Sequence, residues 1–150
     1  VDAGRGIVLF GPAGSGKDHL LAALGRQAIQ AGLCVTWKNG RDLAGEFREA
    51  ARDGAFRSER NILEDLEPAE VLILSDPIPP AGGLTPFQAD VMFRLVDARY
   101  RAMKATWATL NVSGGDEADN RLGAQIVDRL KHDALAIFTD WPSYRKARSV

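Results

Sequence analysis

The sequence contains a single cysteine, Cys34, among its 150 residues. One thiol excludes a framework of internal disulfide bonds and is typical of proteins from a reducing compartment, so we expect a cytoplasmic location. The apolar runs are equally short. Residues 7–10 form one of the longest, whereas a helix needs about 20 apolar residues to cross a bilayer. We therefore expect no membrane partner.

An excess of charge of one sign is also absent, because 19 basic residues face 20 acidic ones and the net charge is −1. This balance does not indicate a nucleic-acid-binding protein, so any DNA site must be a local patch. Four basic residues are candidates for such a patch: Arg94, Arg99, Arg101 and Lys104. Arg94 and Arg101 each follow an aspartate by four residues, which favours a solvated face of paired charges instead.

The chain has no internal repeat, low-complexity segment or linker that would divide it. Its length and its hydrophobic share of 45% are those of one soluble domain. We expect a single domain over residues 1–150. Because the chain begins with Val1 instead of methionine and runs almost at once into a strand, we expect this core to be truncated on its N-terminal side.

Apolar runs and helical periodicity alternate along the chain. The expected strands are residues 7–10, 33–37, 71–74, 106–112 and 134–138. The expected helices are residues 17–31, 42–51, 86–103 with Thr85 as N-cap, and 116–132, with a shorter helical stretch at 61–66. Strands that alternate with helices predict an α/β domain with a parallel sheet covered on both faces.

The strongest chemical signal is a glycine-rich segment between the first strand and the first helix, where a phosphate-binding loop of the form G-x-x-x-x-G-K belongs. The candidate nucleotide-binding residues are Gly11, Pro12, Ala13, Gly14, Ser15, Gly16, Lys17, Asp18 and His19. Glycines let the backbone direct successive N–H groups at phosphate oxygens, and the helix N-terminus adds the positive end of its dipole. Lys17 would bridge the outer phosphates. The sequence therefore predicts binding of ATP or ADP.

The apolar strand at residues 71–74 ends in Ser75 and Asp76, the form of a Walker B element that serves Mg²⁺ and the attacking water. The usual site has Ser or Thr after the loop lysine and two acidic residues at the strand end. This chain has Asp18 at the first place and Ser75 at the second. Two interpretations stay open. In one, Asp18 and Ser75 have exchanged roles and bind Mg²⁺ together with Asp76. In the other, the site is degenerate and binds nucleotide weakly or without Mg²⁺.

The order and spacing of several short motifs resemble the DnaC/IstB-like AAA+ ATPases, which are bacterial and phage helicase loaders and transposition helper ATPases. The similar segments are residues 11–20, 72–76, 98–100, 109–111, 122–130 and 143–145. The resemblance implies a P-loop NTPase fold of AAA+ type. Such a fold is a three-layer sandwich with a five-stranded parallel sheet in the order 5-1-4-3-2, here without a helical lid.

The resemblance also implies catalytic roles for Lys17, Asp76, Asn111 and Arg129. Asp76 would orient the attacking water or bind the metal. Asn111 would sense the γ-phosphate. Arg129 would be an arginine finger that reaches the ATP of a neighbouring subunit. For Arg145 there are two readings: contact with the nucleotide from the C-terminal end, or membership of a solvated basic tail.

The resulting hypothesis is an ATPase that couples ATP binding and hydrolysis to helicase loading in DNA replication or to transposition. The expected partners are a replicative helicase or a transposase, single-stranded DNA, and further copies of the intact protein, although the excised core alone is compatible with a monomer. Three alternatives remain: a nucleotide-binding regulator with little hydrolysis, a small P-loop nucleotide kinase, and an interaction module with a vestigial loop. The kinase is disfavoured because His19 follows Gly-Lys-Asp where such kinases usually carry threonine.

Overall fold

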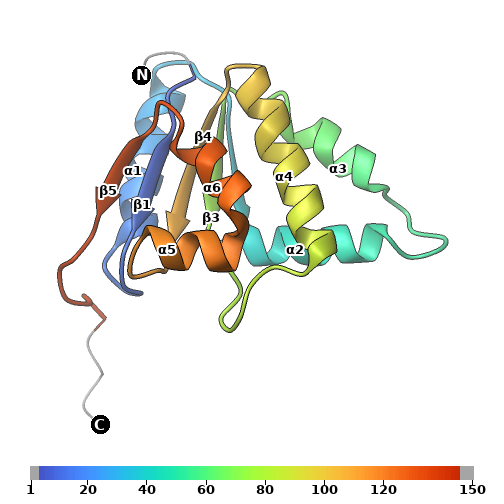
Figure 1. Cartoon of the computed structure of the whole chain (residues 1–150). Helices are drawn as coiled ribbons and strands as arrows, with labels where there is room; N and C mark the ends of the chain where they lie inside the picture. Colours follow the sequence, from blue (N-terminus) through green and yellow to red (C-terminus); the bar gives the residue numbers. More distant parts are fainter. Residues whose placement is uncertain (1–3, 146–150) are drawn as a thin grey trace, which may run out of the picture.

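The computed structural model describes residues 4–145 and contains a five-stranded sheet with all strand pairs parallel (Figure 1). The strands are β1 (Ile7–Phe10), β2 (Val35–Asn39), β3 (Val71–Ser75), β4 (Ala105–Leu110) and β5 (Leu135–Phe138). Their order is β2-β3-β4-β1-β5, which is the predicted order 5-1-4-3-2 read from the other edge. The strand order expected for a P-loop fold of AAA+ type is confirmed.

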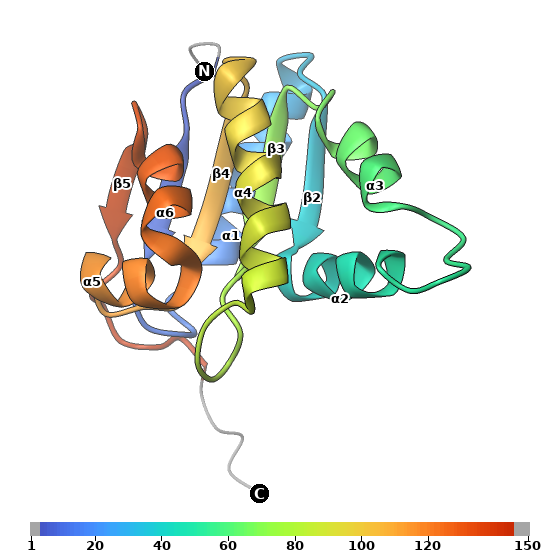
Figure 2. The same cartoon turned by 45° about the vertical axis from the view of Figure 1, so that its right-hand side comes forward.

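The helices cover the two faces of the sheet unequally. They are α1 (Lys17–Gln30), α2 (Gly40–Ala50), α3 (Glu59–Leu66), α4 (Pro86–Arg101), α5 (Gly115–Ala118), the π-helical turn η1 (Asp119–Gly123) and α6 (Ala124–Lys131). Figures 1 and 2 show α1 behind the sheet and α4 and α6 in front of it. Leu21 of α1 packs with Trp107 in one core cluster, whereas the larger cluster joins α2, α3, α4 and α6 to the opposite face. The sandwich therefore has three layers, as predicted.

The central and edge strands differ in burial. Every residue of β3 and β4 is buried, as expected for continuous apolar runs in a parallel sheet with both faces covered. Edge strand β5 is more open, and the side chains of Leu135 and Phe138 are exposed. No helix among residues 4–145 combines the length and the apolar character needed to cross a membrane.

Most predicted elements are present with bounds that differ by one or two residues, and two of the differences have a clear local cause. The second strand begins at Val35, not at residue 33, because Gly32 adopts a left-handed φ of +89° and the N–H of Leu33 donates to the carbonyl of Ala28. These residues close the end of α1 in place of starting a strand. The single helix expected over residues 116–132 is interrupted, because Gly123 has a φ of +109° between η1 and α6.

Arg99 corrects the prediction for the basic patch. Its side chain is fully buried, and its guanidinium donates to the carbonyls of Leu66, Glu67 and Ala105 and to the hydroxyl of Thr106. Burial lowers the pKa of Arg99 to about 10. The side chain joins α4 to the end of α3 and the start of β4, so neither a solvated nor a DNA-facing position is correct for Arg99.

The other three residues of the basic patch are engaged at the surface. Arg94 pairs with Asp90 at 3.2 Å, and Arg101 pairs with Asp97 at 2.9 Å. Lys104 donates to two backbone carbonyls. The predicted face of paired charges is therefore confirmed for Arg94 and Arg101.

Candidate nucleotide site

Three glycines with positive φ shape the loop between β1 and α1. Gly11, Gly14 and Gly16 have φ values of +150°, +81° and +87°, which side-chain-bearing residues rarely adopt. Gly16 is the N-cap of α1, and no side chain among the described residues caps this helix end. The first N–H groups of a helix lack partners within the helix and attract anions. The loop therefore has the backbone geometry of a phosphate site.

Lys17 lies inside this loop and is buried. Its Nζ donates to the carbonyls of Gly11 and Pro12 at 3.0 and 2.7 Å and to the Ser15 hydroxyl at 3.3 Å. Burial lowers the pKa of Lys17 below its ordinary value, and two nearby carboxylates oppose this shift. A phosphate oxygen bound by the loop N–H groups would therefore also lie close to the Lys17 ammonium group.

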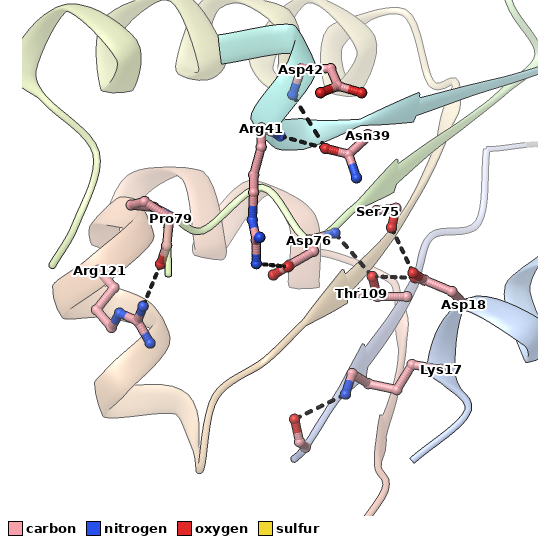
Figure 3. A network of polar contacts seen from close by, with 11 residues as sticks. Lys17, Asp18, Asn39, Arg41, Asp42, Ser75, Asp76, Pro79, Thr109 and Arg121 are labelled. Carbon is pink, nitrogen blue, oxygen red and sulfur yellow. Dashed lines mark hydrogen bonds and ion pairs between the residues drawn. The ribbon is translucent and has the colours of Figure 1, made fainter. Parts of the chain in front are cut away.

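Asp18 lies at the centre of a hydroxyl–carboxylate cluster (Figure 3). The Ser75 hydroxyl donates to its Oδ2 and the Thr109 hydroxyl donates to its Oδ1, each at 2.8 Å. Ser75 and Thr109 are direct partners in the register of β3 and β4. The structure thus shows the adjacency of Asp18 and Ser75 on which the exchange hypothesis depends, while their role as metal ligands stays a prediction. Sequence reasoning missed Thr109 as a site residue, because only the register of β3 and β4 brings it opposite Ser75.

Asp76 follows β3 with a left-handed φ of +48°. Its N–H donates to the hydroxyl of Thr109 at 3.0 Å, and its Oδ2 forms an ion pair with Arg41 in the first turn of α2 (Figure 3). Its Oδ1 is buried without a hydrogen-bond partner in the described part of the chain. Such an oxygen has capacity to accept a hydrogen bond or to bind a cation. Sequence reasoning missed Arg41, because no local motif links it to the end of β3.

The oxygen atoms in this cluster fit Mg²⁺ that is shared with a phosphate. Mg²⁺ usually binds one or two carboxylates and completes its shell with phosphate oxygens and water. Asp18 would supply a carboxylate and Ser75 a hydroxyl, and Oδ1 of Asp76 would serve either the metal or a water molecule. Within residues 4–145 there is no group of three or more His, Cys, Asp or Glu side chains that could hold a metal. The donor set therefore suits a metal bound together with nucleotide, not an all-protein cage.

Asn111 lies at the carboxyl end of the parallel strands, the same end of the sheet as the loop. It directly follows β4, which runs between β1 and β3, and its side chain is partly buried. The same end of the sheet carries four other predicted site residues: Lys17, Asp18, Ser75 and Asp76. The structure thus brings together all the predicted catalytic and metal-binding residues except Arg129.

Arg129 lies in the last turn of α6, at the opposite end of the sheet, where the strands begin. It forms ion pairs with Asp97 and Asp128 at 3.1 and 3.0 Å, and its guanidinium lies 5.0 Å from the ring centre of Tyr100. A cavity of about 460 Å³ beside it is lined by Gly6, which precedes β1. From this position Arg129 does not reach the phosphate loop of its own chain.

Arg145 lies beside the phosphate loop. A Cβ atom added at Gly14 would lie 3.4 Å from the Cδ of Arg145, and the N–H of Tyr144 donates to the carbonyl of Gly14. The charge of Arg145 also contributes to the lowered pKa of Lys17, after burial as the main cause. The remaining basic residues of the C-terminal tail, Lys146 and Arg148, lie outside the described residues.

Comparison with known proteins gives consistent relatives. The model of the family described as IstB-like ATP binding protein matches residues 1–150. An insertion sequence ATP-binding protein of Sinorhizobium fredii is 33% identical over 149 residues, which cover 95% of this chain and 47% of the relative. The IS21 insertion-sequence ATP-binding protein of Pseudomonas aeruginosa is 32% identical over 153 residues, which cover 97% of this chain and 54% of that relative.

The replicative helicase loader DnaC of Escherichia coli strain K12 is 26% identical over 142 residues, covering 93% of this chain and 56% of the loader. The chain therefore spans about half the length of the curated relatives it matches. Among solved structures, a DnaC helicase loader superposes with a TM-score of 0.78 at 21% identity, covering 91% of this chain and 79% of that one. DnaA from Aquifex aeolicus bound to AMPPCP gives 0.72 at 19% identity, covering 89% and 40%. At these identities the structural likeness shows the fold alone.

Proposed function

The chain belongs to the IstB-like ATP-binding protein family, and from this premise we propose that it binds ATP with Mg²⁺ and hydrolyses the ATP in support of DNA transposition. The two insertion-sequence relatives, at 33% and 32% identity, favour this role. Loading of a replicative helicase is the second candidate, favoured by the 26% identity with DnaC. Residues 1–150 act in either case as a single ATPase core domain.

One observation carries the proposal: Asp18 accepts hydrogen bonds from Ser75 and Thr109 next to the buried Lys17. Asp18 supplies the carboxylate and Ser75 the hydroxyl that usually occupy each other's places. The exchange keeps the local charge and the set of oxygen ligands unchanged. Asp18 and Ser75 would hold Mg²⁺ together with the nucleotide, and the metal would supply neutralisation of charge on the phosphates.

The chain's own residues supply the remaining steps. Loop N–H groups and Lys17 bind and orient the triphosphate. Asp76 accepts a hydrogen bond from the attacking water through its unpartnered Oδ1, while Arg41 holds the other oxygen. Asn111 contacts the γ-phosphate from the end of β4.

Arg129 acts on the ATP of another subunit, because it lies at the amino end of the strands and its own phosphate loop lies at their carboxyl end. The intact protein therefore works as a homo-oligomer together with a transposase or helicase, and with single-stranded DNA as a further partner. Mixing tests this arrangement. A Lys17→Ala variant and an Arg129→Ala variant of the intact protein, each inactive alone, should regain turnover when combined, since one supplies the site and the other supplies the arginine.

The proposal as a whole is tested by titrating the protein with ATP and ADP in the presence and absence of Mg²⁺, followed by turnover assays on the intact protein. We expect Mg²⁺-dependent ATP binding that Lys17→Ala abolishes. Binding without turnover in the assembled protein would favour a non-hydrolysing regulator. Transfer of phosphate to a nucleoside monophosphate would favour a kinase. Absence of binding at millimolar nucleotide would leave an interaction module with a vestigial loop.

A further inference from the structure

The segment after β5, residues 139–145, runs along the phosphate loop, and we call it the C-terminal strap. The indole Nε1 of Trp141 donates to the carbonyl of Ser15 at 2.7 Å. The N–H of Tyr144 donates to the carbonyl of Gly14 at 2.9 Å. The strap thus contacts two successive peptide groups of the loop through their oxygen atoms.

Thr139, the first strap residue, is fully buried against the start of the loop. Its N–H donates to the carbonyl of Phe10 at 2.8 Å, and its hydroxyl shares a hydrogen bond of 2.8 Å with the Ser15 hydroxyl. A Cβ atom at Gly11 would collide with the Thr139 side chain. The loop and the strap are therefore in close contact at this point.

The contacts of the strap have a consequence for the opposite side of the loop. A peptide group is planar, so the carbonyl of one residue and the N–H of the next turn together. A hydrogen bond that fixes the Ser15 carbonyl therefore fixes the direction of the Gly16 N–H, and a bond to the Gly14 carbonyl fixes the Ser15 N–H. Among the backbone groups of the loop, the strap bonds only to carbonyl oxygens, which leaves the N–H groups of Ser15 and Gly16 to phosphate.

We propose that Trp141 is a positioning residue for phosphate binding: its indole N–H holds the peptide between Ser15 and Gly16 so that the Gly16 N–H faces the phosphates of ATP. Thr139 supports the same peptide from the side chain of Ser15. The predicted effect on ATP affinity rests on the proposed function. The contact between Trp141 and the loop is present without nucleotide and can be tested separately.

The test replaces Trp141 by phenylalanine, which keeps an aromatic ring and removes the N–H donor. Backbone hydrogen exchange of residues 11–19 should rise in the protein without nucleotide, while exchange in α4 stays unchanged. The affinity for ATP should fall about tenfold, the effect of one lost hydrogen bond that pre-orders a site. The midpoint of thermal unfolding should not change. A lowered midpoint would be expected if Trp141 only stabilised the fold.

Trp37 on β2 offers a matched control, because it is another partly exposed tryptophan, 41% exposed against 37% for Trp141, and lies away from the loop. Trp37→Phe should leave exchange and affinity unaltered. Thr139→Val serves as a second variant that removes the other contact to Ser15 while keeping the side-chain shape, and it should raise loop exchange in the same direction.

The outcomes separate this inference from the proposed function. Unchanged loop exchange in both strap variants overturns the positioning role, even when ATP binds well. A rise in loop exchange in a protein that binds no nucleotide supports positioning of the loop and contradicts the ATPase proposal. A rise in exchange together with unchanged ATP affinity overturns the role in phosphate binding.

Discussion

Asp18 accepts a hydrogen bond from Ser75 at 2.8 Å, although 57 positions separate the two residues in the chain. Each residue is unusual for its own motif, and each has the chemical group that the other motif normally provides. Their contact means that the local set of one carboxylate and one hydroxyl is kept. The two departures therefore have to be tested as a pair.

Exchanging the two residues gives the first prediction. The single changes Asp18→Thr and Ser75→Asp should each weaken Mg²⁺-dependent ATP binding about tenfold or more, because the first removes the only carboxylate of the pair and the second places two carboxylates side by side. The double variant should recover most of the affinity. Binding is measured by calorimetry with and without Mg²⁺. A double variant that binds no better than either single change contradicts the exchange.

Arg41 gives the second prediction, because it pairs with the carboxylate of Asp76. Arg41→Ala should lower the turnover number of the intact protein several-fold while ATP affinity stays nearly the same, since the pair orients Asp76 and does not contact the loop. The stability cost should be about 1 kcal/mol, because Arg41 is half exposed, although the Asp76 side chain is only 15% exposed. Arg48→Ala, at an exposed position on the same helix, is the control and should change neither quantity. Equal effects of the two variants on turnover would exclude a role for the pair.

Arg99 gives the third prediction. Arg99→Met leaves buried carbonyl groups of Leu66 and Ala105 without their donor, so the free energy of unfolding should fall by about 3 kcal/mol. Urea denaturation measures the loss. Arg101→Met on the same helix is the control, because its side chain is 78% exposed and its partner Asp97 keeps a second ion pair with Arg129. Its cost should stay below about 1 kcal/mol, and similar costs for both variants would contradict the structural role of Arg99.

Glu117 gives the fourth prediction, which concerns pH. Hydrogen bonds from the backbone and side chain of Ser113, and then from Arg121, lower the pKa of Glu117 from 4.5 to about 2. A lowered folded-state pKa stabilises the fold above the unfolded value and loses that contribution as pH falls. The stability difference between the wild type and Glu117→Gln should therefore be constant above pH 4.5 and shrink between pH 4.5 and 2. Parallel stability curves for the two proteins over that interval would show that the hydrogen bonds do not act on the ionised form.

The sequence predicted the parts of the site that depend on neighbouring residues. The phosphate loop and the Ser75–Asp76 strand end are local patterns, and the alternation of strands and helices fixed the fold class. Thr109 and Arg41 were missed because strand register and the placement of α2 bring them to Asp18 and Asp76. These relations are long-range and leave no local pattern.

Arg99 shows the opposite failure, in which a local pattern suggested the wrong environment. On α4 it follows the buried Val91 and Leu95 at four-residue spacing, which indicates the apolar face. Its charge, and the surface ion pairs expected for Arg94 and Arg101 on the same helix, favoured solvent instead. Its acceptors come from the end of α3 and the start of β4. Only the packing of three elements supplies enough carbonyl groups to compensate a buried guanidinium.

The three tryptophans lie in three different environments. Trp107 is buried in the core, with its indole N–H bonded to the carbonyl of Arg5, and Trp37 is partly exposed on β2. Trp141 alone of the three hydrogen-bonds to the phosphate loop. A molecule that enters the loop therefore changes the surroundings of one indole and leaves the other two as an internal reference. The protein thus carries its own optical probe of the nucleotide site, readable as a change in emission without any attached dye.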